Sequence, residues 1–152
     1  MDERTTRALI RVIKENELWL MRRILSYAKS QGYTKYTSTL VEAWRAFILG
    51  LSEAIARAMD THSDRLPEFS PEESFDQDSM TEFGVKEASL HRQRGVSLPM
   101  FLGLYKYYRY TFQDLVREAD MDEADRPSCH RFVERCFDRI EKGEQPACIE
   151  IC

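Results

Sequence analysis

The residues of this 152-residue chain that could do chemistry are its histidines and cysteines. His62, His91 and His130 are far apart in the sequence, and they form no visible catalytic triad. The sequence also contains no nucleophile elbow, no glycine-rich phosphate loop and no HExxH zinc motif. We therefore predict that the chain is not an enzyme, and we take His91 as its candidate ligand-binding residue.

The four cysteines allow two further kinds of chemistry. Together with His130 they could form a zinc site, but the spacing of Cys129, Cys136, Cys148 and Cys152 matches no standard zinc motif. Cys129 and Cys136 fall on the apolar stripe of a predicted helix, which favours buried thiols. A redox role for Cys148 and Cys152 stays open, because they lie one turn apart if that segment is helical.

The elements that must position these residues are predicted from apolar residues that recur at helical spacing. The chain has only six glycines and five prolines, which favours long helices over a β protein with many turns. The expected helices span 5–30, 39–60, 79–93, 98–119 and 125–142, with a short helical turn near 71–76. The predicted fold class is therefore all-α, a bundle of about five to six helices.

Two polar or helix-breaking stretches set the expected boundaries. The sequence Lys14-Glu15-Asn16-Glu17 interrupts the first apolar stripe, so a bend or a break into two helices is open there. Gly143 is expected to end the last helix, and Pro146 is expected to prevent its continuation. We therefore predict one domain over 1–143, followed by a linker or tail over 144–152.

A corner between two helices directly follows His91. Gly95 is placed to be the left-handed residue after the third main helix, which we expect to begin at Ser79. Ser97 is placed to cap the next helix with its side chain, and Pro99 falls in the first turn of that helix.

Gly84 and Ala88 lie on the same side of a helix as His91, at spacings of four and three. Two small residues beneath a histidine either leave room for a flat ligand or let another helix approach closely. The second explanation is the commoner one, and it makes His91 a packed residue.

The composition bears on partners and location. The apolar fraction is 43%, and 22 basic against 26 acidic residues give a net charge of −4, which argues against nucleic acid as the main partner. No apolar run approaches the ~20 residues that span a bilayer, and the N-terminus lacks a signal-peptide pattern. We therefore expect a cytoplasmic protein without a membrane partner, whose cysteines are free thiols.

Two surface patterns could mark partner sites. Leu18 and Trp19 exceed what one core-facing stripe needs, so their helix is either buried on two sides or part of a homodimer face. Aromatic and basic residues are interleaved in the sequence Lys106-Tyr107-Tyr108-Arg109-Tyr110. Such a pattern can bind single-stranded nucleic acid, although half-buried tyrosines with solvated hydroxyls explain it as well.

The sequence from His91 onward resembles a known family. His91, followed by Gly95 and Val96, and then by Gly103 and an aromatic residue at 105, resembles the segment between the F and G helices of globin-coupled sensors. This resemblance implies a globin-like fold in which His91 is the proximal haem ligand.

Residues 94–98 also resemble the N-terminal helical domains of stressosome-type regulators and of related bacterial sensor histidine kinases. Those domains adopt a globin-like fold, and several of them hold no haem. By chain order alone, Tyr33 and Trp44 are candidates for the distal position. Arg92 and Arg94 could pair with haem propionates, or they are simply solvated.

These observations lead to three functional hypotheses. The leading one is a haem-free sensory or regulatory domain of a bacterial two-component or stress system, which forms a homodimer and acts on a downstream signalling domain by helix repacking. The alternative is a haem-based gas or redox sensor with His91 as proximal ligand. The third is a small helical enzyme or a nucleic-acid-binding module.

Overall fold

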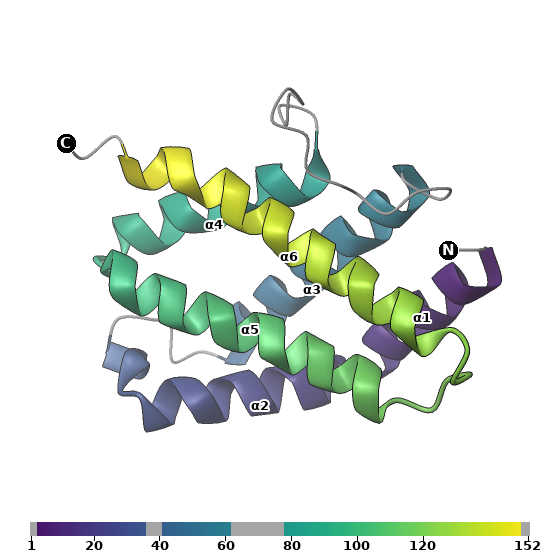
Figure 1. Cartoon of the computed structure of the whole chain (residues 1–152). Helices are drawn as coiled ribbons and strands as arrows, with labels where there is room; N and C mark the ends of the chain where they lie inside the picture. The colour runs from purple at the N-terminus through teal and green to yellow at the C-terminus, as the bar shows by residue number, and fades with distance from the viewer. Residues whose placement is uncertain (1–2, 36–40, 62–77, 150–152) are drawn as a thin grey trace.

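The structure is a computed structural model, and it describes residues 3–35, 41–61 and 78–149 (Figure 1). These ranges contain helices and turns but no strand, which confirms the predicted all-α bundle of five to six helices. The helices are α1 (Glu3–Glu15), α2 (Glu17–Ser30), α3 (Val41–Thr61), α4 (Ser79–Gln93), α5 (Leu98–Glu118) and α6 (Arg126–Ile149), with a short 3₁₀ turn η1 (Tyr33–Lys35). The predicted turn near 71–76 and His62 lie outside the described residues.

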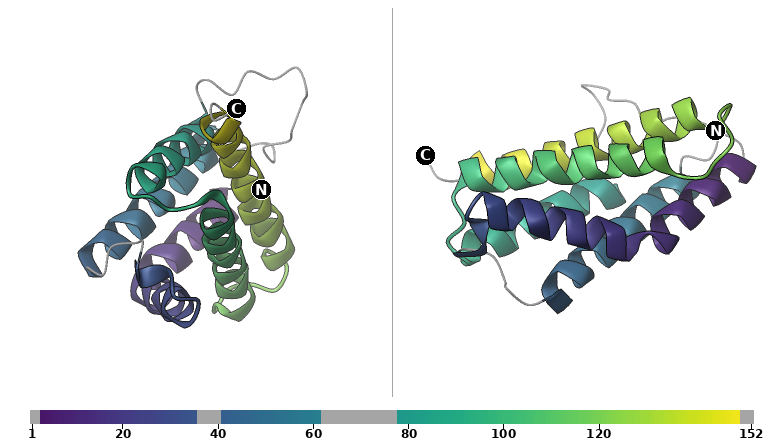
Figure 2. Two further views of the ribbon diagram at one scale, coloured as in Figure 1. Left: turned by 90° about the vertical axis from the view of Figure 1, so that its left-hand side faces the viewer. Right: turned by 90° about the horizontal axis from the view of Figure 1, so that it is seen from below.

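The helices pack around one core. Along the bundle α4 and α6 lie against each other, α5 lies beside α6 and α2, and α3 packs against α2 and α4 (Figures 1 and 2). Large apolar side chains that are fully buried between these helices form the core, among them Leu20, Ile24, Ile48, Leu51, Ile55, Met59, Phe112 and Phe132. Within the described helices, none is long and apolar enough to cross a membrane.

The polar interruption near residue 16 breaks the first predicted helix into α1 and α2. The Asn16 backbone N–H donates to the Ile13 carbonyl at 3.2 Å, and the Asn16 amide Nδ2 donates to the Val12 carbonyl at 2.8 Å. The Asn16 carbonyl then accepts the N–H of Leu20 at 2.9 Å, which starts α2. The side chain of Asn16 thus replaces one helical hydrogen bond where the chain bends.

The corner between α4 and α5 has the predicted backbone conformation. Gly95 has φ +74°, its N–H donates to the Arg92 carbonyl at 2.9 Å, and the Val96 N–H donates to the His91 carbonyl at 3.1 Å. This pair of bonds is the Schellman arrangement, which satisfies carbonyls at the end of a helix. Pro99 lies in the first turn of α5, as expected.

The start of α4 at Ser79 is as predicted, but the predicted side-chain cap of α5 needs correction. Ser97 precedes α5, but its side chain makes no capping hydrogen bond, and only its carbonyl accepts the Phe101 N–H at 2.9 Å. At the start of α4 the capping residue is Asp78, one position before Ser79, because the Asp78 carboxylate accepts the Thr81 N–H at 2.9 Å. A carboxylate is the stronger acceptor for an unpaired backbone N–H at the positive end of a helix.

The prediction that Gly143 ends the last helix is wrong. α6 continues through Gly143 and Pro146 to Ile149. Both residues weaken a helix without forbidding it, because glycine can adopt helical φ values and the φ of proline is close to the helical one. The domain boundary at residue 143 stays a prediction.

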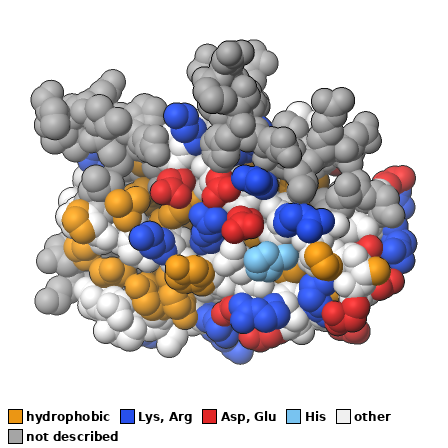
Figure 3. Space-filling model, viewed as in Figure 1, with side chains coloured by type: hydrophobic (Ala, Val, Ile, Leu, Met, Phe, Trp, Pro, Cys, Tyr) orange, Lys and Arg blue, Asp and Glu red, His pale blue; other side chains and the backbone are white. Residues whose placement is uncertain are grey.

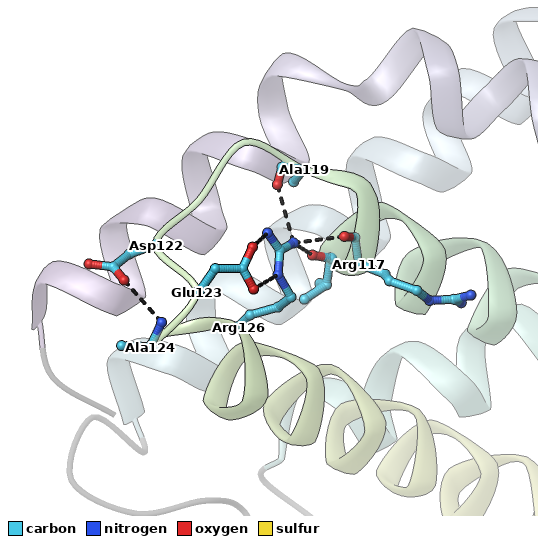
Figure 4. A network of polar contacts seen from close by, with 7 residues as sticks. Arg117, Ala119, Asp122, Glu123, Ala124 and Arg126 are labelled. Atoms are coloured by element: carbon cyan, nitrogen blue, oxygen red, sulfur yellow. Dashed lines mark hydrogen bonds and ion pairs between the residues drawn. The ribbon is translucent and has the colours of Figure 1, made fainter.

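The corner between α5 and α6 is closed by a side chain that the sequence did not single out (Figure 4). The Arg126 Nη1 donates to the carbonyls of Val116, Arg117 and Ala119 at 2.6, 2.8 and 3.2 Å. The same guanidinium pairs with the Glu123 carboxylate, with contacts of 2.7 and 3.1 Å. Arg126 therefore holds the last carbonyls of α5 from the first residue of α6.

Candidate functional site

His91 lies in the last turn of α4 with its imidazole almost wholly buried, at 7% exposure. Its Nδ1 is 2.8 Å from the carbonyl oxygen of Glu87, one turn earlier. Because a carbonyl only accepts, Nδ1 must carry the proton of this hydrogen bond. Burial lowers the pKa of His91, and the Arg94 charge lowers it further, against the opposing effect of the Glu87 hydrogen bond. The imidazole is therefore neutral near pH 7, and Nε2 is an acceptor.

A second buried titratable side chain lies beside this imidazole. A carboxylate oxygen of Glu87 is 3.8 Å from His91 Nδ1, which is within ion-pair distance. Burial raises the pKa of Glu87 while it lowers that of His91, so each group is shifted toward its neutral form. We therefore do not regard the contact as a stable ion pair. Burial and the Glu87 charge also raise the pKa of Tyr108.

The His91 pocket is a small cavity with mainly aromatic walls. Phe101 of α5 packs on the imidazole, with 5.0 Å between ring centroids. The other aromatic side chains that line the cavity come from α3, α4, α5 and α6, namely Phe47, Phe83, Tyr105, Tyr108 and Phe137. The free volume is about 10 Å³, which is room for one water molecule.

A haem group does not fit beside His91 in this conformation. The cavity of about 10 Å³ is far smaller than a porphyrin ring. Gly84 serves the close approach of another helix, since a Cβ on Gly84 would lie 2.3 Å from the Ile140 carbonyl oxygen of α6. This contact confirms the commoner of the two explanations for Gly84, whereas Ala88 packs with Val96 and Phe101. A flat ligand would have to separate packed helices.

Of the other candidate haem-site residues carried over from the family resemblance, those whose side chains the structure describes do not line the His91 cavity. Tyr33 packs instead against α5, where a Cβ on Gly103 would lie 2.5 Å from the Tyr33 hydroxyl. The Trp44 side chain lies outside the part of the chain that the structure describes. Arg92 and Arg94 are exposed and are not among the residues that line the cavity.

The cysteines that the structure describes are packed thiols. Cys129 and Cys136 are both fully buried on the core side of α6. Burial raises the pKa of Cys129 to about 11 and that of Cys136 still further, so neither is a thiolate near neutral pH. Among the described residues there is no group of three or more His, Cys, Asp or Glu placed to hold a metal ion. The side chains of Cys148 and Cys152 are not described.

The basic and aromatic residues of α5 are largely engaged within the bundle. Tyr107 stacks on Tyr27 of α2 at a centroid distance of 3.7 Å. Arg109 pairs with Asp138 of α6 at 3.0 Å and with Glu134 at 3.4 Å. Figure 3 shows the result, with acidic and basic side chains interspersed where α5 and α6 lie side by side. This face has no continuous basic patch for a nucleic-acid backbone.

One buried polar contact was missed in the sequence. Arg139 of α6 is 1% exposed, and its Nη1 lies 3.5 Å from a carboxylate oxygen of Asp78. Asp78 also accepts from the Thr81 hydroxyl at 2.8 Å, so this cap ties the start of α4 to α6. The available signal was the position of Arg139 one turn after Cys136, on the edge of the apolar stripe.

No family model matches this chain, no curated protein matches it, and no solved structure matches its fold. The His91 pocket and the packing of the helices around it are therefore the features on which a function can be proposed.

Proposed function

We propose that this chain is a non-catalytic sensory domain of a bacterial signal-transduction protein. In this proposal a change at the His91 pocket shifts the packing of α4, and α6 passes the shift to a downstream output domain, a histidine kinase or a stress regulator. The observation that carries the proposal is the contact between Gly84 and the backbone of Ile140, because it joins the helix that bears His91 directly to α6.

The chemistry of the pocket supports a role as a receiver of signals. His91 and Glu87 are buried next to each other among aromatic rings, where a new charge or a new hydrogen bond has a large electrostatic effect. The space is nearly filled, so a bound molecule larger than a water must displace the walls. Packed cores respond to such changes by discrete rearrangements, which is what a relay needs.

Hydrogen exchange followed by mass spectrometry tests the relay. In the His91→Ala variant we expect faster amide exchange in α4 and in the part of α6 around Ile140. The matched control is Leu20→Ala, which removes a fully buried side chain on α2, so its faster exchange should centre on α2. Equal patterns in the two variants, or an unchanged α6 in His91→Ala, would contradict the relay.

One observation favours haem binding as a second candidate. The bond from Nδ1 to the Glu87 carbonyl fixes the tautomer and leaves Nε2 as the nitrogen that could bind a metal. The test is a visible absorption spectrum with added haemin, for the wild type and for His91→Ala. A Soret band lost in His91→Ala would show that the pocket opens around haem. Identical spectra for the two proteins would remove this candidate.

A further inference from the structure

The start of α2 carries an apolar surface that the relay does not use. Leu18 is 52% exposed, and Trp19 beside it is only partly buried. An open hollow of about 490 Å³ adjoins them where the chain bends between α1 and α2. Its lining consists of Glu15, Asn16, Leu18, Trp19, Arg22 and Arg23.

One wall of this hollow is held in place from within the monomer. The Arg23 guanidinium lies 5.0 Å from the centre of the Trp19 ring, and the same guanidinium is paired with Asp114 of α5. Arg23 therefore covers one face of the Trp19 ring, and Arg23 is itself held by Asp114. Such a prearranged aromatic wall loses little conformational entropy when a second surface packs on it.

Two charged residues of opposite sign line this hollow, one on each side of Leu18 and Trp19 in the sequence. Glu15 lies three residues before Leu18, and Arg22 lies three residues after Trp19. Both side chains belong to exposed residues, and neither forms an ion pair with any residue that the structure describes. If two copies of residues 15–22 cross antiparallel about a two-fold axis between Leu18 and Trp19, Glu15 at the end of α1 in each copy faces Arg22 of α2 in the other.

We propose that this surface is the interface of a symmetric homodimer. Leu18 of each copy fills the hollow beside Trp19 of the other, and two Glu15–Arg22 pairs flank the contact. A second copy suits the surface better than an anionic partner does, because Arg23 is already paired with Asp114 and the lining then presents one acidic and one basic side chain, Glu15 and Arg22. The inference does not depend on the relay through α6, and it locates the interface away from the His91 pocket.

Sedimentation velocity of the purified chain over a range of concentrations tests this interface. We expect a dimer that Leu18→Asp dissociates. Because the two-fold axis repeats the contact, Glu15→Arg and Arg22→Glu each create two pairs of like charges across the interface. Each variant should raise the dimer dissociation constant by about tenfold. The double variant E15R/R22E restores opposite charges and should restore the dimer. This rescue separates an ion-pair contact from damage to the fold.

The matched control is Val85→Asp on α4, which alters an apolar residue that is 41% exposed but far from the hollow in the sequence. It should leave the dimer intact. A monomer at all concentrations, or a dimer insensitive to Leu18→Asp and to both charge swaps, would overturn the inference. The inference would also be overturned if the protein were monomeric and its Trp fluorescence shifted when anionic phospholipid vesicles were added. Each of these outcomes leaves the hydrogen-exchange test of the relay unaffected.

Discussion

The two corners of the second half of the bundle end a helix by different means. Between α4 and α5 the backbone closes the corner itself, because Gly95 takes a left-handed conformation and two N–H groups reach back to carbonyls of the same helix. Between α5 and α6 the residue that follows α5 has an ordinary extended conformation, with φ −66° and ψ 149° at Ala119. There the carbonyls are satisfied by the Arg126 side chain.

The difference shows how far each corner depends on the rest of the molecule. The Gly95 corner is local, because every atom that closes it lies within a few residues of the turn. The Arg126 corner requires the first residue of α6 to reach back to the end of α5, because its donor lies seven to ten residues after the carbonyls that it bonds. We therefore expect the Gly95 corner to tolerate changes in helix packing. We expect the Arg126 corner to be lost when the packing changes.

Arg126→Met should cause the largest loss of stability at either corner. The variant keeps an apolar stem but leaves the carbonyls of Val116, Arg117 and Ala119 without their donor. We expect a larger fall in the free energy of urea unfolding than for any substitution at the Gly95 corner. Glu123→Gln is the control, since it removes the ion pair and keeps the carbonyl bonds. An Arg126→Met loss no larger than that of Glu123→Gln would contradict the capping role.

Gly95→Ala should cost about 1–2 kcal/mol, the penalty for a left-handed conformation at an alanine. A Cβ at this position would meet nothing within 4 Å, so backbone strain is the main cause. Gly32→Ala is a matched control, because Gly32 has φ +71° and its surroundings are equally open. Urea unfolding should give similar losses for the two variants. A much larger loss of unfolding free energy for Gly95→Ala than for Gly32→Ala would show that backbone strain is not the main cause.

The Gly95 corner should also respond to pH through His91. Burial lowers the pKa of folded His91 below the ordinary value of 6.5, so the unfolded chain binds a proton that the folded chain excludes. This contribution to stability is complete above pH 6.5 and decreases as the pH falls below it. Urea unfolding at a series of pH values should show a smaller acid loss in His91→Gln. Equal pH slopes for the two proteins would contradict the assignment.

Ser97→Ala should have the smallest effect, a change within about 0.5 kcal/mol. A side chain that caps a helix is typically worth about 1 kcal/mol, but Ser97 makes no such bond. Asp78→Ala is the contrasting variant, because the Asp78 carboxylate caps α4 and contacts buried Arg139. Thermal unfolding of the two variants should differ clearly. A large loss for Ser97→Ala would show that its hydroxyl is a cap in solution.

The parts of the fold that depend on neighbouring residues could be predicted from the sequence. Apolar spacing predicted the helices, the polar run around Asn16 marked where a bend or a break was open, and Gly95 predicted its corner. Each of these features is set by side-chain period or by backbone freedom over one or two turns. The predicted end of the last helix at Gly143 was wrong, because Gly143 and Pro146 change helix stability by amounts that the surrounding turns can offset.

The parts that depend on distant residues could not be predicted. His91 was singled out, but the size of its pocket depends on side chains from α3, α5 and α6, including Phe47, Phe101 and Phe137. Arg126 and Arg139 read as ordinary charges, because their partners are carbonyls or carboxylates brought near by folding. In the sequence alone, such residues cannot be told apart from solvated arginines.

The contact between Gly84 and Ile140 has a mechanical consequence. The Ile140 carbonyl occupies the place where a side chain on residue 84 would project, so α4 cannot slide along α6 without a clash. In the proposed relay this contact is the pivot about which α4 tilts, and the tilt must also repack the other side chains between the two helices. His91 lies seven residues along α4, about 10 Å from this pivot at the helical rise per residue. In the proposed relay α4 would therefore act as a lever, with the imidazole at the end of its arm.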